Sequence, residues 1–246
     1  MILSDSPKIQ AFNIDCMEFM KDKPDNYYDL AIVDPPYGIG DKLLLGGHTG
    51  KVKLQEQYEL NKWDNERPDK IYFAELMRTS RNQIVWGANY FWEFLYPSRG
   101  IISWDKNLGS PYNFSHFELA WTSFDCIARR KIIGSNTGGR IHPTQKPIQL
   151  YRWLLDTYAS CKYCQNQGTY YEDVAGDGGS QMEMACDECC RADRNFKILD
   201  THGGSFSSAI ACHMEGYDLD ICELDEDYFN DAVKRFKLNT VQEVLF

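Results

Sequence analysis

The sequence predicts an α/β protein built around a parallel, doubly wound, Rossmann-like sheet. Along the 246 residues, short apolar stretches typical of strands alternate with segments of helical periodicity. One such strand ends at Asp200 and runs into a glycine turn, and the next strand ends at Glu223. A glycine turn followed by an acidic residue at the tip of the next strand is typical of sheets that bind a nucleoside at their carboxyl edge. We therefore expect one catalytic domain over residues 1–246.

The expected elements follow from periodicity and from helix-end signals. A strand ending near Asn13 precedes a helix that Asp15 caps, with Glu18 three positions later. Gly216 ends a later helix. The other expected strands are 30–33, 83–86, 100–106, 117–124, 197–200 and 217–222, and the other expected helices are 68–81, 148–158, 207–215 and one from 224 onward. The polar stretch 38–64 predicts a loop beside the site.

The composition limits the functional classes open to the chain. With 43% hydrophobic residues the chain can bury a full core, and it has no apolar run long enough to span a membrane. The N-terminal residues lack the basic and apolar segments of a signal peptide, so a cytoplasmic location without a membrane partner is expected. Nine cysteines in a reducing compartment favour metal binding or buried thiols over disulfides.

The stretch Asp34-Pro35-Pro36-Tyr37 directly follows the apolar strand and carries the expected chemistry. Two consecutive prolines fix the backbone and remove two N–H donors, so this turn offers only hydrogen-bond acceptors. An amino group on a heteroaromatic ring fits such a turn, because its hydrogens can go to the Asp34 carboxylate and the Pro35 carbonyl while Tyr37 stacks on the ring. These four residues are the predicted catalytic residues.

The chain resembles the DNA amino-methyltransferases, the N-4/N-6 DNA methylase family, whose Asp/Asn/Ser-Pro-Pro-Tyr motif these residues match without substitution. The stretch from His142 to Pro147 resembles the family's motif beside the methionine end of the cofactor. Segments that begin at Trp86, Trp104 and Leu119 resemble phage-type adenine-N6 methyltransferases. Because the catalytic turn precedes the cofactor turn in this chain, the resemblance implies the circularly permuted β class of the S-adenosylmethionine-dependent methyltransferase fold.

The resemblance also implies a site for S-adenosylmethionine. In the family an acidic residue at the position of Asp15 contacts the cofactor adenine. The position of Glu223 at the tip of a strand predicts that it binds the ribose hydroxyls. The expected cofactor-binding residues are Asp15, Cys16, Asp34, His142, Thr144, Lys146, Asp200, His202, Gly203, Gly204, Ser205 and Glu223. Phe206 stands where the family usually has a second glycine, so either the backbone there is conventional or cofactor affinity is reduced.

Binding to double-stranded DNA needs a local basic face, because the net charge of the chain is −10. The segment 125–141 lies where family members carry target-recognition residues, and its basic side chains are the candidates, although any such group is also common on a solvated surface. These are Arg129, Arg130, Lys131 and Arg140. Other basic candidates are Arg78, Arg81, Arg99 and Lys106. The segment is short, so a short target site follows.

A cysteine-rich insertion over residues 161–195 separates the two parts of the chain that resemble the family. Cys161 and Cys164 form one CxxC pair, and Cys186 and Cys189 form another. Two such pairs can complete a tetrahedral zinc site, whereas the alternative is four free thiols. The polar residues between the pairs would not build a core without such a crosslink. A small structural zinc site in this insertion is the prediction.

The sequence thus predicts a DNA methyltransferase that flips an adenine and transfers a methyl group to N6 from S-adenosylmethionine. Cytosine-N4 methylation is the first alternative, because it uses the same geometry. A cofactor-poor DNA-binding or scaffold protein is an alternative of another class, suggested by Phe206, the acidic charge and the insertion. A homodimer and a cognate restriction enzyme are partners that the resemblance allows.

Overall fold

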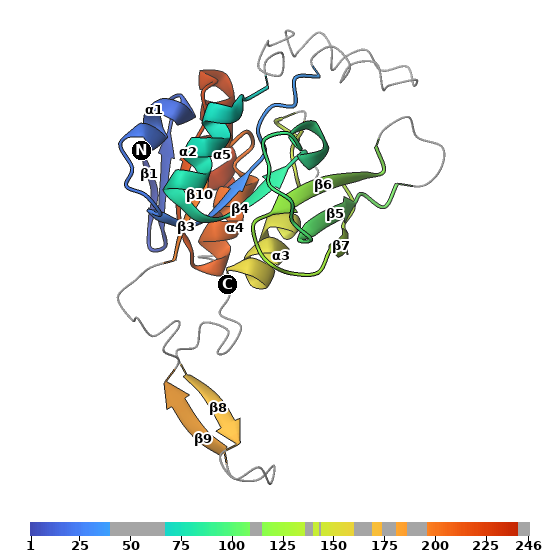
Figure 1. Ribbon diagram of the computed structural model, residues 1–246. Helices are drawn as coiled ribbons and strands as arrows, with labels where there is room; N and C mark the ends of the chain where they lie inside the picture. Colours follow the sequence, from blue (N-terminus) through green and yellow to red (C-terminus); the bar gives the residue numbers. More distant parts are fainter. Residues whose placement is uncertain are drawn as a thin grey trace.

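A computed structural model describes residues 1–39, 67–108, 115–135, 140–142, 144–159, 169–173, 181–185 and 196–240 of the chain. Its body is a nine-stranded sheet in the order β1-β2-β11-β10-β3-β4-β6-β5-β7 (Figure 1). The strands of this sheet are β1 (Ile2–Asp5), β2 (Lys8–Phe12), β3 (Tyr28–Val33), β4 (Ser80–Trp86), β5 (Ile101–Asp105), β6 (Phe117–Thr122), β7 (Arg129–Ile132), β10 (Lys197–Asp200) and β11 (Asp218–Cys222). Only β1 and β6 run antiparallel to their neighbours.

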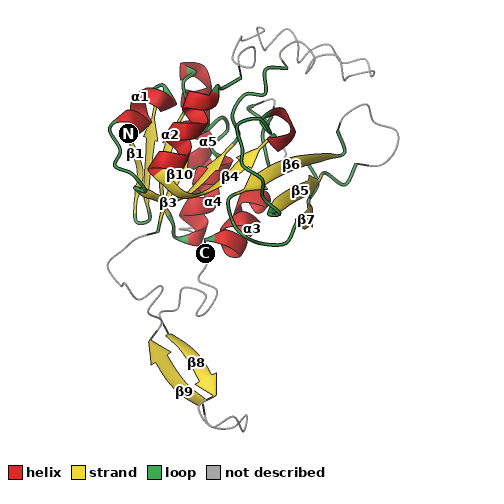
Figure 2. Cartoon of the chain, in the orientation of Figure 1, coloured by secondary structure: helices red, strands yellow, loops and turns green. Residues whose placement is uncertain are grey.

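Helices cover both faces of the sheet, as Figure 2 shows. They are α1 (Cys16–Lys21), α2 (Lys70–Thr79), α3 (Ile148–Tyr158), α4 (Ser207–Glu215) and α5 (Glu226–Thr240), with a short 3-10 helix η4 (Ala88–Tyr90). Along β3, Leu30 and Ile32 pack into the cluster with α3, α4 and α5, while Ala31 and Val33 pack into the cluster with α1 and α2. This alternation follows from the two-residue period of a strand and gives the sheet two buried faces.

Most expected elements are present. The helices at 148–158 and 207–215 have the predicted bounds, and Gly216 ends α4 with a left-handed φ of 80°. The expectation of a parallel sheet needs correction at β6, which pairs antiparallel with both β4 and β5. No helix joins β5 to β6 among the residues described, and neighbouring strands in parallel need a long crossover connection, which is usually a helix. The strands at the two sheet edges, β1 and β7, were not predicted from the sequence.

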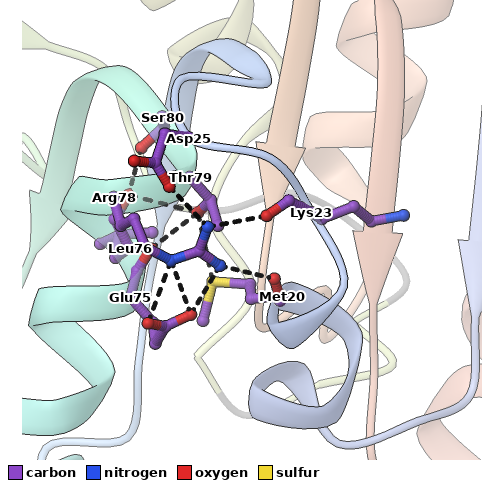
Figure 3. A network of polar contacts seen from close by, with 8 residues as sticks. All are labelled: Met20, Lys23, Asp25, Glu75, Leu76, Arg78, Thr79 and Ser80. Atoms are coloured by element: carbon purple, nitrogen blue, oxygen red, sulfur yellow. Dashed lines mark hydrogen bonds and ion pairs between the residues drawn. The ribbon is translucent and has the colours of Figure 1, made fainter.

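Arg78 at the end of α2 is a structural crosslink (Figure 3). Its guanidinium pairs with Glu75 at 2.8 Å and with Asp25 at 2.9 Å, and it donates to the carbonyls of Met20 and Lys23. These bonds join α2 to the end of α1 and to the turn that leads into β3. The candidate role of Arg78 in DNA binding therefore has little support, because its donors are already used.

Two further strands, β8 (Thr169–Asp173) and β9 (Gln181–Ala185), pair antiparallel in a separate two-stranded sheet. The sequence analysis did not predict them. The four predicted zinc ligands and most of the loop 38–64 lie outside the described residues. In the part of the chain that is described, no cluster of His, Cys, Asp and Glu side chains could hold a metal ion. None of the described helices is long and apolar enough to cross a membrane.

Candidate active site

The site lies at the carboxyl edge of the sheet, between β3 and β10. The chain continues from β3 to β4 on one side and from β10 to β11 on the other, so the direction of winding reverses at this pair (Figure 1). Such a switch point opens a crevice outside the strand ends. The turn after β3 carries Asp34, the turn after β10 carries Gly203 and Gly204, and Glu223 follows β11. The fold therefore brings the two predicted motifs to one edge.

A single cavity of about 920 Å³ joins these turns. Most of the predicted site residues line it, namely Asp15, Cys16, Asp34, Pro36, His142, Thr144, Lys146, His202, Gly203, Gly204, Ser205 and Glu223. Three predicted residues, Pro35, Tyr37 and Asp200, are not among the lining residues. Asp200 is 2% exposed and instead holds the turn, accepting hydrogen bonds from the Ser208 hydroxyl at 2.5 Å and the His202 amide at 3.1 Å. Burial raises its pKa to about 7.

Both carboxylate oxygens of Asp34 have partners. The Tyr37 hydroxyl donates to Oδ1 at 2.6 Å, and the Lys146 ammonium donates to Oδ2 at 2.5 Å. Burial raises the pKa of Asp34 above its ordinary value, and the Lys146 ammonium opposes that rise. Asp34 is thus a buried acceptor whose charge depends on a neighbouring cation.

Tyr37 packs against the segment that follows β4. Its ring stacks on Tyr90 with a centroid distance of 4.8 Å and an interplanar angle of 13°. Gly87 lies under the same ring, and a Cβ atom at Gly87 would come within 2.1 Å of Tyr37 Cε1. Gly87 also has a φ of 70°, so both the close approach and the backbone require glycine there.

The glycine turn after β10 is held by polar contacts to β11 and α5. The Gly204 amide donates to Glu223 Oε2 at 2.7 Å, and the Asp225 amide donates to Glu223 Oε1 at 3.0 Å. The Arg235 guanidinium donates to the Ser205 carbonyl at 2.5 Å. Burial raises the pKa of Glu223, although these backbone bonds oppose that rise.

Phe206 answers one of the questions left open by the sequence. Its φ is 56°, in the left-handed region that a glycine would adopt, so the backbone keeps the glycine conformation. Its side chain is fully buried and meets the edge of Phe229, with a centroid distance of 5.8 Å. Phe206 is not a lining residue of the cavity, so its ring does not obstruct it.

Two histidines, the buried His142 and the half-buried His202, line the cavity. The His142 ring packs on Gly204, where a Cβ atom would lie 3.6 Å from the ring, and so joins the predicted methionine-end segment to the glycine turn. His202 Nδ1 lies 2.9 Å from Thr201 Oγ1, which in turn contacts the Tyr72 hydroxyl at 2.7 Å. Burial lowers the pKa of each histidine to about 4, so both rings are neutral at pH 7.

Three of the helices that begin at the cavity are each capped by an aspartate that also lines it. Asp15 accepts from the first amides of α1, Asp69 from those of α2, and Asp225 from those of α5. A helix N-terminus with free amides attracts phosphate, but a carboxylate already occupies these three, whereas α4 begins at Ser207 without a side-chain cap. The cavity wall is therefore acidic at the three capped helix starts and favours positive charge there.

Solved structures resemble the chain in fold. They include M1.HpyAVI in complex with S-adenosylmethionine, at 17% identity and a TM-score of 0.51, covering 93% of this chain and 99% of that one. A proposed DNA modification methylase from Thermus thermophilus has 13% identity and a TM-score of 0.52 over 94% of this chain and 95% of its own. The chain has the fold of S-adenosylmethionine-dependent methyltransferases. The cytosine-N4-specific PvuII DNA methyltransferase is also similar, at 10% identity and a TM-score of 0.53 over 93% of this chain and 86% of its own.

These identities are low, so the similarity establishes the methyltransferase fold and not the reaction. No protein-family model and no curated protein matches the sequence.

Several residues that line or adjoin the cavity were not predicted from the sequence. These are Asp69, Tyr72, Glu118, Tyr151, Asp225, Tyr228 and Arg235. Asp69 precedes a helix and Asp225 a final helix, so their capping pattern was a usable signal. The tyrosines and Glu118 gave none, because an aromatic or acidic residue inside a strand or helix is usually part of the core or the surface.

The predicted DNA-binding residues lie apart from the cavity, on the edge strand β7 and beyond it. Arg130 pairs with Asp105 at 2.5 Å, Lys131 lies 5.3 Å from the centroid of the Trp153 ring, and Arg140 donates to the Ser135 carbonyl at 3.0 Å. The other basic candidates are paired too, Arg81 with Asp29, Arg99 with Asp125 and Lys106 with Glu118. An exposed pair such as Arg99–Asp125 exchanges readily with other anions and is compatible with phosphate binding, whereas the side chains of Lys106 and Glu118 are only 17% and 23% exposed.

Proposed function

We propose that this protein is a DNA methyltransferase that transfers a methyl group from S-adenosylmethionine to the N6 amino group of adenine. One observation supports this most strongly: a single cavity joins the acceptor turn at Asp34 to the glycine turn and Glu223. A nucleoside held at the glycine turn would then lie beside the group that receives an amine. The methyltransferase fold supports the same assignment.

The charge of the cavity supports S-adenosylmethionine over a phosphate-bearing nucleotide. The aspartates that cap α1, α2 and α5 repel phosphate, whereas S-adenosylmethionine has none and carries a sulfonium and an ammonium group. Glu223 and Asp15 would hold its ribose and adenine, as the resemblance implies. The segment that carries His142 and Thr144 would lie at its methionine end. When bound, the cofactor supplies the electrophilic methyl group.

The protein's own part in the reaction is to bind and orient the amine. Asp34 Oδ1 accepts one amine hydrogen in place of the Tyr37 hydroxyl, and the Pro35 carbonyl accepts the other. As the resemblance implies, the base ring would stack on Tyr37 in place of Tyr90, on which the Tyr37 ring stacks in the protein without a bound base. These acceptors stabilise the positive charge that develops on the amine nitrogen, and the fixed turn aligns the nitrogen for direct transfer. No covalent enzyme intermediate is required.

Adenine is favoured over cytosine because the first motif residue is Asp34, whereas serine is commoner in the cytosine-N4 subgroup that the family resemblance describes. We also infer the permuted β class, because β3 with Asp34 precedes β10 with the glycine turn along the chain. Residues 125–141 remain the proposed target-recognition segment within the catalytic domain 1–246. Flipping of the target base, a homodimer and a cognate restriction enzyme stay predictions.

The test is methylation of DNA by the purified protein and by its Asp34→Ala variant. The wild-type protein is incubated with unmethylated DNA and labelled S-adenosylmethionine, and the product nucleosides are separated to identify N6-methyladenine or N4-methylcytosine. We expect N6-methyladenine, and we expect Asp34→Ala to lower the rate by ~10²-fold or more. Cofactor affinity, measured by calorimetry, should stay nearly unchanged.

Each result separates the candidate functions. N4-methylcytosine as the product would replace adenine with cytosine as the substrate. Failure to bind S-adenosylmethionine would favour a DNA-binding or scaffold protein. An Asp34→Ala variant that kept more than about a tenth of the activity would contradict the proposed role of Asp34.

A further inference from the structure

A network of ion pairs centred on the buried Lys146 lies behind the catalytic turn, and it was not predicted from the sequence. The Lys146 side chain is 2% exposed, and its ammonium lies 2.5 Å from Asp34 Oδ2 and 3.1 Å from Glu118 Oε2. The other oxygen of Glu118 pairs with Lys106 at 2.7 Å. Burying such charges costs free energy unless each one is paired, and here positive and negative groups alternate from Lys106 to Asp34.

The three residues of this network nearest the catalytic turn come from separate segments. Asp34 follows β3, Glu118 belongs to β6, and Lys146 lies in the segment before α3. Because β6 runs antiparallel to β4, its first residues reach the same edge of the sheet as the carboxyl end of β3. The Lys146 backbone is itself fixed, since its carbonyl accepts from the Ser207 hydroxyl at 2.7 Å. The Lys146 residue is therefore fixed at both ends, by the hydrogen bond to its backbone carbonyl and by the two carboxylates that pair with its ammonium group.

We propose that Lys146 is a positioning residue for methyl transfer and that Glu118 holds it in place. This inference rests on the proposed function. Lys146 fixes Oδ2 of Asp34 and leaves Oδ1 as the oxygen that receives the amine hydrogen of the base. Without a bound base, Oδ1 accepts from Tyr37, so the incoming amine exchanges with a phenol and leaves the lysine contact intact.

The electrostatic reason is that only an ionised Asp34 is a pure acceptor. Burial raises the pKa of Asp34, Lys146 opposes that rise and Glu118 adds to it. Lys146 and Glu118 thus have opposite effects on the same carboxyl group. The other titratable or charged groups around Asp34 and Lys146 are Tyr37, Lys106, His142, Tyr151 and Asp200.

A different role for Lys146 would be to bind the cofactor carboxylate, as the resemblance suggests. The two roles predict different kinetics. A residue that positions Asp34 affects the rate of transfer and its pH profile, whereas a residue that binds the cofactor affects mainly the cofactor dissociation constant.

The experiment compares Lys146→Gln, Lys146→Arg and Glu118→Gln in single-turnover methylation between pH 5 and 9. For Lys146→Gln we expect the rate at pH 7 to fall at least tenfold. The acid limb of the pH–rate profile, where the rate falls with decreasing pH, should move to higher pH. The cofactor dissociation constant should stay within about twofold of wild type. For Glu118→Gln the acid limb should move to lower pH. Lys146→Arg should restore the wild-type acid limb, because it keeps the cation.

Lys197→Gln is the matched control. Lys197 also pairs with a buried carboxylate, Asp220, at 3.1 Å, but it lies at the start of β10, at the opposite edge of the sheet from the cavity. Its loss should lower stability and leave the acid limb unchanged. A merely structural role for Lys146 would give the same result.

The proposal is overturned if Lys146→Gln leaves the acid limb in place while it weakens cofactor binding tenfold or more. If Lys146→Gln fails to fold, Glu118→Gln still decides, because an unmoved or upward-shifted limb contradicts the proposal. Carboxyl-carbon NMR titration of Asp34 in wild type and Glu118→Gln gives a readout that needs no activity. If the wild-type protein methylates no DNA, the proposed function is wrong. The NMR titration of Asp34 would still test whether Lys146 and Glu118 affect its ionisation.

Discussion

His142 and His202 carry the clearest pH dependence at the scale of single residues. Burial lowers the pKa of each from 6.5 to about 4, so the folded protein binds fewer protons than the unfolded chain between these values. The stability that comes from keeping the rings neutral is fully present above pH 6.5 and is lost as the pH falls toward 4. Asp200 has the opposite effect in the acid range, because its folded pKa is raised to about 7.

A histidine variant isolates one of these contributions. His202→Asn keeps an amide group near the position of Nδ1, which contacts Thr201, and removes the titration. Between pH 7.5 and 5.5 we expect wild type to lose about 1.4 kcal/mol more unfolding free energy than the variant. Urea unfolding at both pH values measures this difference. Equal losses in the two proteins would mean that His202 is not buried in the neutral form.

At the scale of a single element, the start of α4 depends on two opposing effects at Phe206, the strain of its backbone and the packing of its side chain. A left-handed backbone costs a residue with a Cβ atom roughly 1–2 kcal/mol, whereas glycine adopts it freely. The buried ring offsets this cost, since removing a buried phenylalanine side chain typically costs about 3–5 kcal/mol. The helix start is therefore kept by packing against Phe229, not by local preference.

Two substitutions at this position should reverse the usual order of alanine and glycine. Phe206→Ala loses the packing and keeps the strained φ, while Phe206→Gly loses the same packing and relieves the strain. We expect Phe206→Gly to be more stable than Phe206→Ala by about 1 kcal/mol in urea unfolding. Cofactor affinity should change little in either, because Phe206 does not line the cavity. If the alanine variant were the more stable one, the left-handed backbone at Phe206 would be wrong.

At the scale of the whole molecule, the zinc site that the sequence predicts in the insertion 161–195 stays a prediction. In the described hairpin of this insertion, Thr169 of β8 is opposite Ala185 of β9. Cys186 directly follows Ala185 in the chain, and Cys164 shortly precedes Thr169. A CxxC pair thus adjoins each strand of one antiparallel hairpin, and a bound metal would stabilise a hairpin that is marginal alone.

Elemental analysis of protein prepared without added metal tests this unit. We expect one zinc per chain, lost in Cys186→Ser but kept in Cys126→Ser, whose cysteine lies in the body of the protein. Metal removal should lower thermal stability without changing which base is methylated. A metal content near zero, with all nine thiols reacting in the folded state, would show that the cysteines bind no zinc.

Features that depend on near neighbours were predictable from the amino-acid order alone. Local patterns of apolar, capping and glycine residues predict the Asp34 turn, the glycine turn with Glu223, the Asp15 cap and the bounds of α3 and α4. The α/β class followed from the alternation of such segments.

Contacts between distant residues emerged only from the folded chain. The antiparallel direction of β6 brings Glu118 to Lys146 and Asp34, and no local pattern encodes that contact, because the three residues come from separate segments. The convergence of three aspartate-capped helices on one cavity depends in the same way on how the sheet is wound. The effect of Phe206 could not be read from the sequence. The strain of its left-handed backbone is local, but the packing on Phe229 that offsets this strain involves another helix.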